Sequence, residues 1–147
     1  MQRVIDSQFF GWTVYEMQES EIDEKKCFMV MSPTKSDSDN YSRKNPYVMI
    51  TRYQNKRVEE FAISMDFEFR IGSKAFIAID DVTFNLQTHK DKAFARNSYD
   101  DAAIIQYMLD SSVLKARADS ASGSYAVDEY NLQGIARAYT RLKYICK

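Results

Sequence analysis

Residues able to do nucleophilic or acid–base chemistry are few and scattered in this chain of 147 residues. The single histidine, His89, lies in the polar segment 87–92. A histidine works as a general base when a nucleophile and an orienting acid lie beside it, and no GxSxG or cysteine–histidine signature accompanies this one. We therefore expect His89 to be a solvated loop residue, and we predict no catalytic residue and no enzymatic activity.

Known metal and cofactor motifs are missing as well. One histidine and two distant cysteines, Cys27 and Cys146, cannot complete a zinc site without carboxylates. Residues 37–40 look like the start of an EF-hand loop, but Ser42 stands where the loop needs glycine and Val48 where it needs glutamate. An irregular surface cation site is the alternative for that segment. No glycine-rich phosphate loop is present, so we predict neither a metal nor a cofactor.

The overall charge excludes some classes of partner. Lys and Arg number 20 against 21 Asp and Glu, and the two signs are interspersed along the chain. Such a chain has no extended positive field for a phosphate backbone, so we expect no nucleic acid partner. No apolar run approaches the ~18 residues of a membrane-spanning helix, so we expect no transmembrane segment.

The sequence does not decide in which cellular compartment the protein is located. Residues 1–6 contain neither an apolar region nor a cleavage site of a signal peptide. The chain is therefore either cytoplasmic, or the mature form of an exported protein whose signal has been removed. An even number of cysteines without a CxxC motif is compatible with one structural disulfide, but does not decide between the two.

Side-chain periodicity predicts a β-rich domain with two helices. Phe10, Trp12 and Val14 alternate with other residues as in a half-buried strand. We expect strands over residues 9–15, 27–31, 47–53, 58–65, 75–79, 82–86, 113–118 and 125–132. An internal helix is expected near 98–110 with Ser98 as its N-cap, and a C-terminal helix near 134–146. The apolar face of the C-terminal helix consists of Ile135, Ala138, Tyr139, Leu142 and Ile145.

These elements predict the fold class. About eight short strands with two added helices indicate a mainly β domain over residues 1–147, an antiparallel β-sandwich or a partial barrel. A chain of this length can bury roughly 70% of its unfolded surface, which suffices for one core.

Several motifs resemble the invasion-associated locus B family of bacterial exported proteins. They are Trp12-x-Val14, the strand around Cys27, Phe76-Ile77-Ala78-Ile79-Asp80, Ala102-Ala103, and the C-terminal pattern Gly123-x-Tyr125-x-x-Asp128-x-Tyr130-x-Leu132-x-Gly134-Ile135-x-x-Ala138. The resemblance covers most of the chain, and the C-terminal pattern is its more specific part. It implies a periplasmic or surface-associated β-sandwich of alphaproteobacterial type, without established catalytic residues, linked in some members to entry into host cells.

The chain departs from the family pattern at its cysteines. Tyr15 stands where the family often has a cysteine, and the cysteine pair usual before the internal helix is missing around residues 96–98. If the usual bridges are absent, Cys27 and Cys146 are left to pair with each other, which would join the C-terminal helix to the second expected strand. The alternative is two buried, reduced thiols in a cytoplasmic protein.

Function is predicted at the level of binding. The polar, aperiodic segment 34–46 is the expected contact surface for a protein or cell-envelope partner, with Asp37, Asp39, Asn40, Tyr41 and Arg43 as contact residues. A second hypothesis is a small carrier that holds an apolar molecule in a cavity. That cavity would be lined by Phe61, Phe76, Ile105 and Leu142. A hydrolase is the weakest hypothesis, because it needs a nucleophile and a carboxylate near His89.

Overall fold

The computed structural model describes residues 2–56 and 58–147, and these residues form eleven strands and two helices. The strands are β1 (Gln2–Phe9), β2 (Trp12–Gln18), β3 (Lys26–Met31), β4 (Lys35–Ser38), β5 (Tyr47–Tyr53), β6 (Val58–Ser64), β7 (Ala75–Ile79), β8 (Val82–His89), β9 (Lys92–Phe94), β10 (Val113–Asp119) and β11 (Tyr125–Asn131). The helices are α1 (Ser98–Leu109) and α2 (Ile135–Ile145). The mainly β class with two helices is confirmed.

The predicted strand count is wrong. All strands join a single antiparallel sheet, in the order β1-β2-β3-β5-β6-β9-β8-β7-β10-β11-β4. This sheet is open, with β1 and β4 as its two edges. The predicted sandwich or partial barrel of about eight strands therefore does not describe it. Three strands, β1, β4 and β9, were missed because two are largely polar and one has three residues. They form through backbone pairing with a neighbour, which side-chain periodicity does not reveal.

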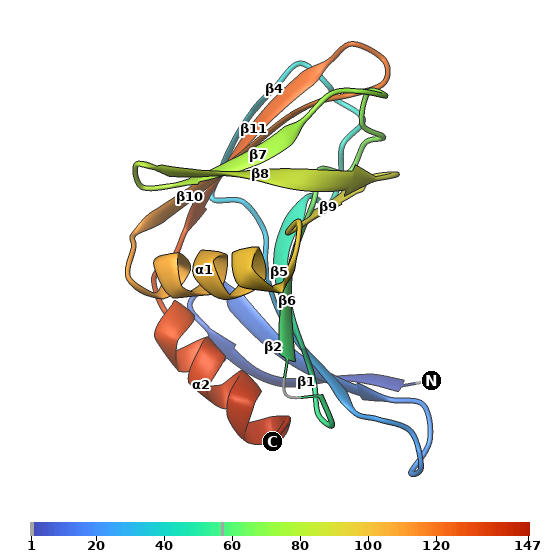
Figure 1. Cartoon of the computed structure of the whole chain (residues 1–147), viewed down its shortest axis with the longest axis vertical. Coiled ribbons are helices and arrows are strands. Elements are labelled where there is room, and N and C mark those ends of the chain that lie inside the picture. The colour runs from blue at the N-terminus through green and yellow to red at the C-terminus, as the bar shows by residue number, and fades with distance from the viewer. Residues whose placement is uncertain (1, 57) are drawn as a thin grey trace.

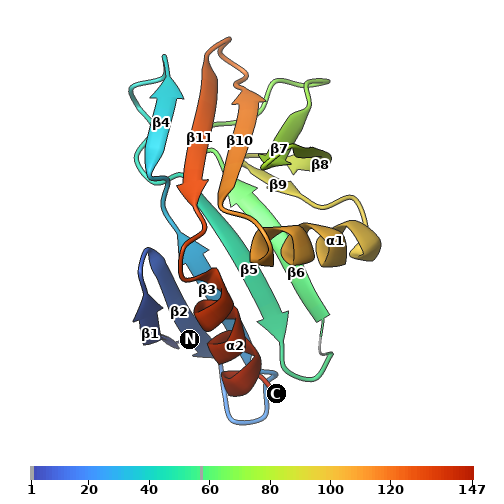
Figure 2. The same cartoon turned by 90° about the vertical axis from the view of Figure 1, so that its left-hand side faces the viewer.

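One long strand joins the two parts of the sheet. Val82–Leu86 of β8 pairs with β7, whereas Gln87–His89 pairs with β9. The sheet bends strongly there, so that β7, β10, β11 and β4 form its upper part and β1, β2 and β3 its lower part (Figure 1). Both helices lie on the same side of the sheet (Figures 1 and 2).

The core lies between the helices and the inner face of the sheet. Its largest fully buried side chains come from most strands and from α1: Trp12, Met29, Ile50, Phe61, Ile63, Met65, Ile77, Ile79, Ile104, Met108, Leu114 and Tyr130. Helix α1 begins one residue earlier than predicted, because the side chain of Asn97 accepts a hydrogen bond from the Asp100 backbone N–H at 2.9 Å. Asn97 is therefore the N-cap, in place of the predicted Ser98.

Helix α2 covers the lower part of the sheet. Ile135, Ala138, Leu142 and Ile145 are buried, as the apolar face of the sequence predicts, and they pack toward β2 and β3. The residue before the helix is Gly134, its N-cap, whose φ is +87°. A Cβ there would lie 2.5 Å from Phe10 Cδ2, so only glycine allows the β1–β2 turn to lie against the start of α2.

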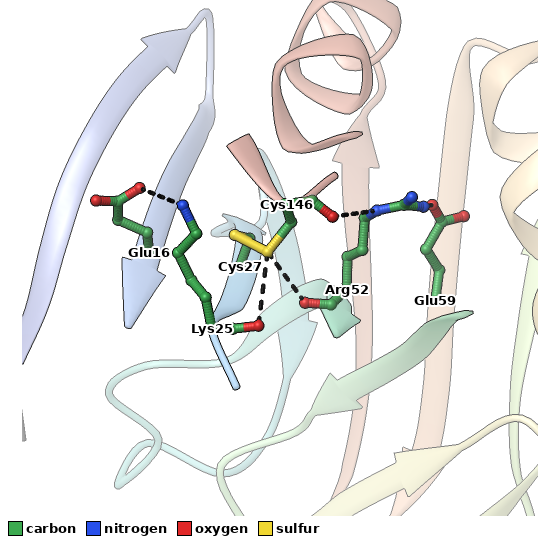
Figure 3. The surroundings of a disulfide bond; sticks show 6 residues. All are labelled: Glu16, Lys25, Cys27, Arg52, Glu59 and Cys146. Carbon is green, nitrogen blue, oxygen red and sulfur yellow. Dashed lines mark hydrogen bonds and ion pairs between the residues drawn. A yellow bond between two sulfur atoms is a disulfide. The ribbon is translucent and has the colours of Figure 1, made fainter. Parts of the chain in front are cut away.

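The predicted disulfide is present. Cys27 of β3 is bonded to Cys146, the residue that follows α2, with a Cα–Cα distance of 6.1 Å and a sequence separation of 119 (Figure 3). Arg52 of β5 reinforces this junction: its Nε donates to the Cys146 carbonyl at 3.0 Å, and its Nη1 contacts Glu59 at 2.6 Å. The end of α2 is thus fixed to the sheet by one covalent bond and one charged side chain.

Loss of the disulfide is expected to destabilise the protein strongly. In the chain-entropy model a closed loop of this length contributes about 4–5 kcal/mol to the free energy of unfolding, because it restricts the unfolded chain. The Cys27→Ala/Cys146→Ala variant should show this loss in urea denaturation. A reductant should destabilise the wild type to a similar extent and leave the variant unaffected. An unchanged wild-type transition in reductant would contradict the expectation.

Candidate functional site

The five predicted contact residues lie around one end of the sheet. Asp37 belongs to edge strand β4, and Asp39, Asn40, Tyr41 and Arg43 belong to the following segment, residues 39–46, which leads to β5. Strand β4 pairs with β11, placing Ser36 opposite Asp128 and Asp37 opposite Val127. The site is therefore built on β11, a strand that lies far along the chain.

Asp37 and Asp39 are used in holding this segment in place. The Tyr125 hydroxyl donates to the Asp37 carboxylate at 3.1 Å, and the Tyr125 backbone N–H donates to Asp39 at 2.8 Å. The hydrogen bond to Asp37 raises the pKa of Tyr125 above its usual value. Asn40 adds a third contact, from its side-chain nitrogen to the Ser124 hydroxyl at 3.1 Å.

A buried ion pair anchors the middle of the segment. The Arg43 guanidinium contacts the Asp128 carboxylate, and the exposed fractions of the two side chains are only 5% and 0%. Arg43 Nε also donates to the Met65 carbonyl at 2.7 Å, and the Ser36 hydroxyl donates to Asp128 at 2.7 Å. These added hydrogen bonds offset the cost of removing both charges from water. Arg43 is thus a structural support of the site, with little surface left for a partner.

The far end of the segment is held by Asp66. Its carboxylate accepts hydrogen bonds from the backbone N–H groups of Asn45, at 2.8 Å, and of Lys44. These bonds, the one from Asn45 first, lower the pKa of Asp66 below its usual value because they stabilise the charged form. The segment is therefore anchored at its start, middle and end.

A polar cleft of about 550 Å³ opens between β4 and this segment. We call it the β4 cleft, and it is lined by Ser32, Pro33, Ser36, Ser38, Asn40, Tyr41, Arg43, Lys44, Asn45 and Pro46. Tyr41 is 94% exposed, and Lys44, three residues later, is also exposed. The cleft offers hydroxyl, amide and ammonium groups around one exposed aromatic ring, which suits hydrogen bonding and stacking with a polar partner.

Beneath the cleft, sequence reasoning missed the importance of Asp128 and Tyr130. Every second residue of this stretch is buried: Ala126, Asp128, Tyr130 and Leu132. A charged residue in such an alternating buried row, Asp128, was the available signal that a partner of opposite charge is buried beside it. The Tyr130 hydroxyl has no hydrogen-bond partner among the described residues. Burial, and then the charge of Asp128, raise the pKa of Tyr130 far above its usual value, so its phenol stays neutral.

The remaining predicted residues lie elsewhere. His89 is exposed at the end of β8. Phe61, Ile105 and Leu142 pack into the core, whereas Phe76 is half-buried on the opposite face of β7 from the buried Ile77. The structure therefore does not bring these four apolar residues around one cavity. Across residues 2–56 and 58–147, no group of three or more His, Cys, Asp or Glu is placed to hold a metal ion.

Comparison with protein-family models, curated proteins and solved structures finds no match to this chain. In the described part of the chain, neither helix is both long and apolar enough to cross a membrane. The chemistry assigned to the β4 cleft therefore follows from its own residues.

Breaking the buried ion pair should cost much more than removing an exposed cation next to it. Arg43→Met leaves Asp128 buried without its partner, and we expect a loss of about 3–5 kcal/mol in the free energy of unfolding. Lys44→Met, the matched control, should change it by no more than about 0.5 kcal/mol. Adding Asp128→Asn to Arg43→Met should restore part of the loss, because the unpaired charge disappears. Equal effects of the two single variants in urea denaturation would contradict this account.

Proposed function

We propose that this chain is a non-catalytic exported domain of the invasion-associated locus B type, which binds a protein or cell-envelope component through the β4 cleft. The observation that carries the proposal is the anchoring of residues 39–46. Asp128 and Asp66 hold this segment by charged hydrogen bonds, and Tyr125 and Ser124 hold its start. A surface ordered before binding loses less conformational entropy when a partner docks, and binds more tightly for that reason.

The contrast between internally bonded residues and an exposed tyrosine in the cleft also supports binding. Arg43, Asp37 and Asp39 are occupied in internal contacts, whereas Tyr41 projects outward. Tyrosine is enriched among residues that dominate binding energy, since it offers a large rigid ring and a hydroxyl. The Ser36 hydroxyl is occupied as well, because it donates to Asp128, which also pairs with Arg43.

The Cys27–Cys146 disulfide supports export to an oxidising compartment, the periplasm or the exterior. Disulfides form and persist there, whereas the cytosol of most organisms keeps thiols reduced. The residues that carry the family resemblance also have structural roles of their own: Asp128 pairs with Arg43, and Gly134 adopts a positive φ at the start of α2.

Tyr41 should be a main determinant of partner binding. The test is binding of the purified protein to immobilised envelope fractions of its native host, measured as an apparent affinity. Tyr41→Ala is expected to weaken binding by about tenfold or more, as for an aromatic side chain that becomes buried in a complex. Tyr99 of α1 is also highly exposed, at 86%, so Tyr99→Ala is the matched control and should bind normally. Equal binding by both variants would remove the β4 cleft from the proposal.

Export predicts the thiol state in the cell. Protein taken from its native host and denatured with an alkylating agent, without reductant, should contain no alkylated cysteine. Peptide mapping should recover Cys27 cross-linked to Cys146, because the disulfide forms in an oxidising compartment. Two alkylated thiols in the intact mass would contradict export and leave the domain as a cytoplasmic binding protein.

A further inference from the structure

A second surface, at the opposite edge of the sheet, lies between β1 and α2. It is a groove of about 510 Å³, and we call it the β1–α2 groove; it is lined by Phe9, Ala136, Arg137, Thr140, Arg141 and Tyr144. Five of these residues share one face of α2, which is turned away from the buried face, and Phe9 is the last residue of β1. Figure 2 shows α2 in front of β2 and β3, with β1 at the margin of the sheet.

The two walls of the groove are held together by an ion pair. Asp6 is the extra residue of an irregularity in β1, where the register shifts between Ile5 and Ser7. Its carboxylate accepts two hydrogen bonds from Arg141, at 2.7 and 2.9 Å. These bonds lower the pKa of Asp6, so the carboxylate stays charged at neutral pH. The groove therefore has a defined width before any partner arrives.

Strand β1 offers a free backbone edge beside this groove. Within the described residues it pairs with β2 alone, and it begins the strand order. Its exposed side chains include Val4, at 45%, and Ile5, at 58%, which is unusual for an edge strand that faces only water. Unpaired N–H and C=O groups next to an apolar recess are the features used in strand addition by an extended peptide.

The charge around the groove selects the kind of peptide. Residues 135–147 contain four basic and no acidic side chains, although the whole chain is nearly neutral. Arg141 is paired with Asp6, but Arg137 makes no ion pair with any described residue. Lys147 lies 4.5 Å from the centre of the Tyr144 ring. Arg137 thus lines a groove whose apolar surfaces are Phe9, Ala136 and Tyr144, and Lys147 adds a second cation through its contact with Tyr144.

We propose that the β1–α2 groove binds an extended acidic segment of a partner protein. The segment adds a strand to β1, places an apolar side chain against Phe9 and Tyr144, and directs carboxylates toward Arg137 and Lys147. A second copy of this chain fits less well, because pairing two β1 edges brings two basic α2 helices together. An anionic lipid would satisfy the cations but not the backbone groups of β1. This surface is separate from the β4 cleft and does not depend on its function.

Affinity for a defined probe tests the charge and the groove together. The probe is a fluorescent peptide of about eight residues, long enough to pair with a strand, that alternates glutamate with valine around one phenylalanine. Wild-type protein should bind it and should not bind the same peptide with lysine in place of glutamate. Arg137→Glu should weaken binding by about tenfold or more, whereas Arg117→Glu, an exposed arginine of β10, should not. Thr140→Trp should block binding by filling the groove.

Amide hydrogen exchange tests strand addition itself. Bound probe should slow exchange along β1, and leave β4, the other edge, unchanged. The proposal is overturned if the probe fails to bind, if it binds without protecting β1, or if Arg137→Glu and Arg117→Glu behave alike. Two other results also overturn it: binding to vesicles of anionic phospholipid without binding to the probe, and a concentration-dependent dimer that Thr140→Trp disrupts.

Discussion

The packing of α2 across β1, β2 and β3 is the interaction on which most of this structure depends. An open sheet with both described helices on one side leaves its apolar inner face exposed unless the helices cover it. Ile135, Ala138 and Leu142 supply that cover over the lower part of the sheet. Gly134 lets the start of the helix approach the β1–β2 turn, and the disulfide fixes its end to β3. The helix is thus held at both ends as well as along its face.

At the outer edge of the upper part of the sheet, charged contacts hold β4 and the segment that follows it. This edge strand is short and polar and would add little stability by itself. The Arg43–Asp128 pair ties the segment after β4 to β11, and Asp66 ties it again near β5. A buried charge is costly when its partner is lost, so these contacts impose one arrangement on residues 39–46. The polar cleft has its shape because of that constraint.

Both proposed recognition surfaces lie at edges of the sheet. The β4 cleft is polar and surrounds an exposed tyrosine, whereas the β1–α2 groove combines apolar side chains with uncompensated cations. Edge strands carry unpaired backbone groups, which proteins either protect or use for binding. Here β4 is short and carries Lys35 and Asp37, whereas the longer β1 is left open along the groove. The two proposals together assign partners of different chemistry to two separate surfaces.

The sequence alone determined the strands and the helix whose apolar side chains recur at regular spacing. Alternation identified the strands that face the core, and the spacing of Ile135, Ala138 and Leu142 identified α2, because burial on one face imposes these patterns. The disulfide followed from the family resemblance and the two remaining cysteines. The residues of the cleft were chosen for their polar composition, which could not distinguish Arg43, a buried support, from Tyr41, an exposed ring.

Tertiary structure decided the rest. Strands β1, β4 and β9 form because their backbones pair with neighbouring strands. Such backbone hydrogen bonds do not require a regular pattern of apolar side chains, so the sequence does not reveal them. Asn97 and Ser98 are both good N-caps locally, and in the folded chain it is Asn97 that has the extended backbone of a cap. Arg43 meets Asp128 across 85 residues, and Asp6 meets Arg141 across 135. Contacts of such range depend on the sheet order, so the two candidate surfaces appear only once the chain has folded.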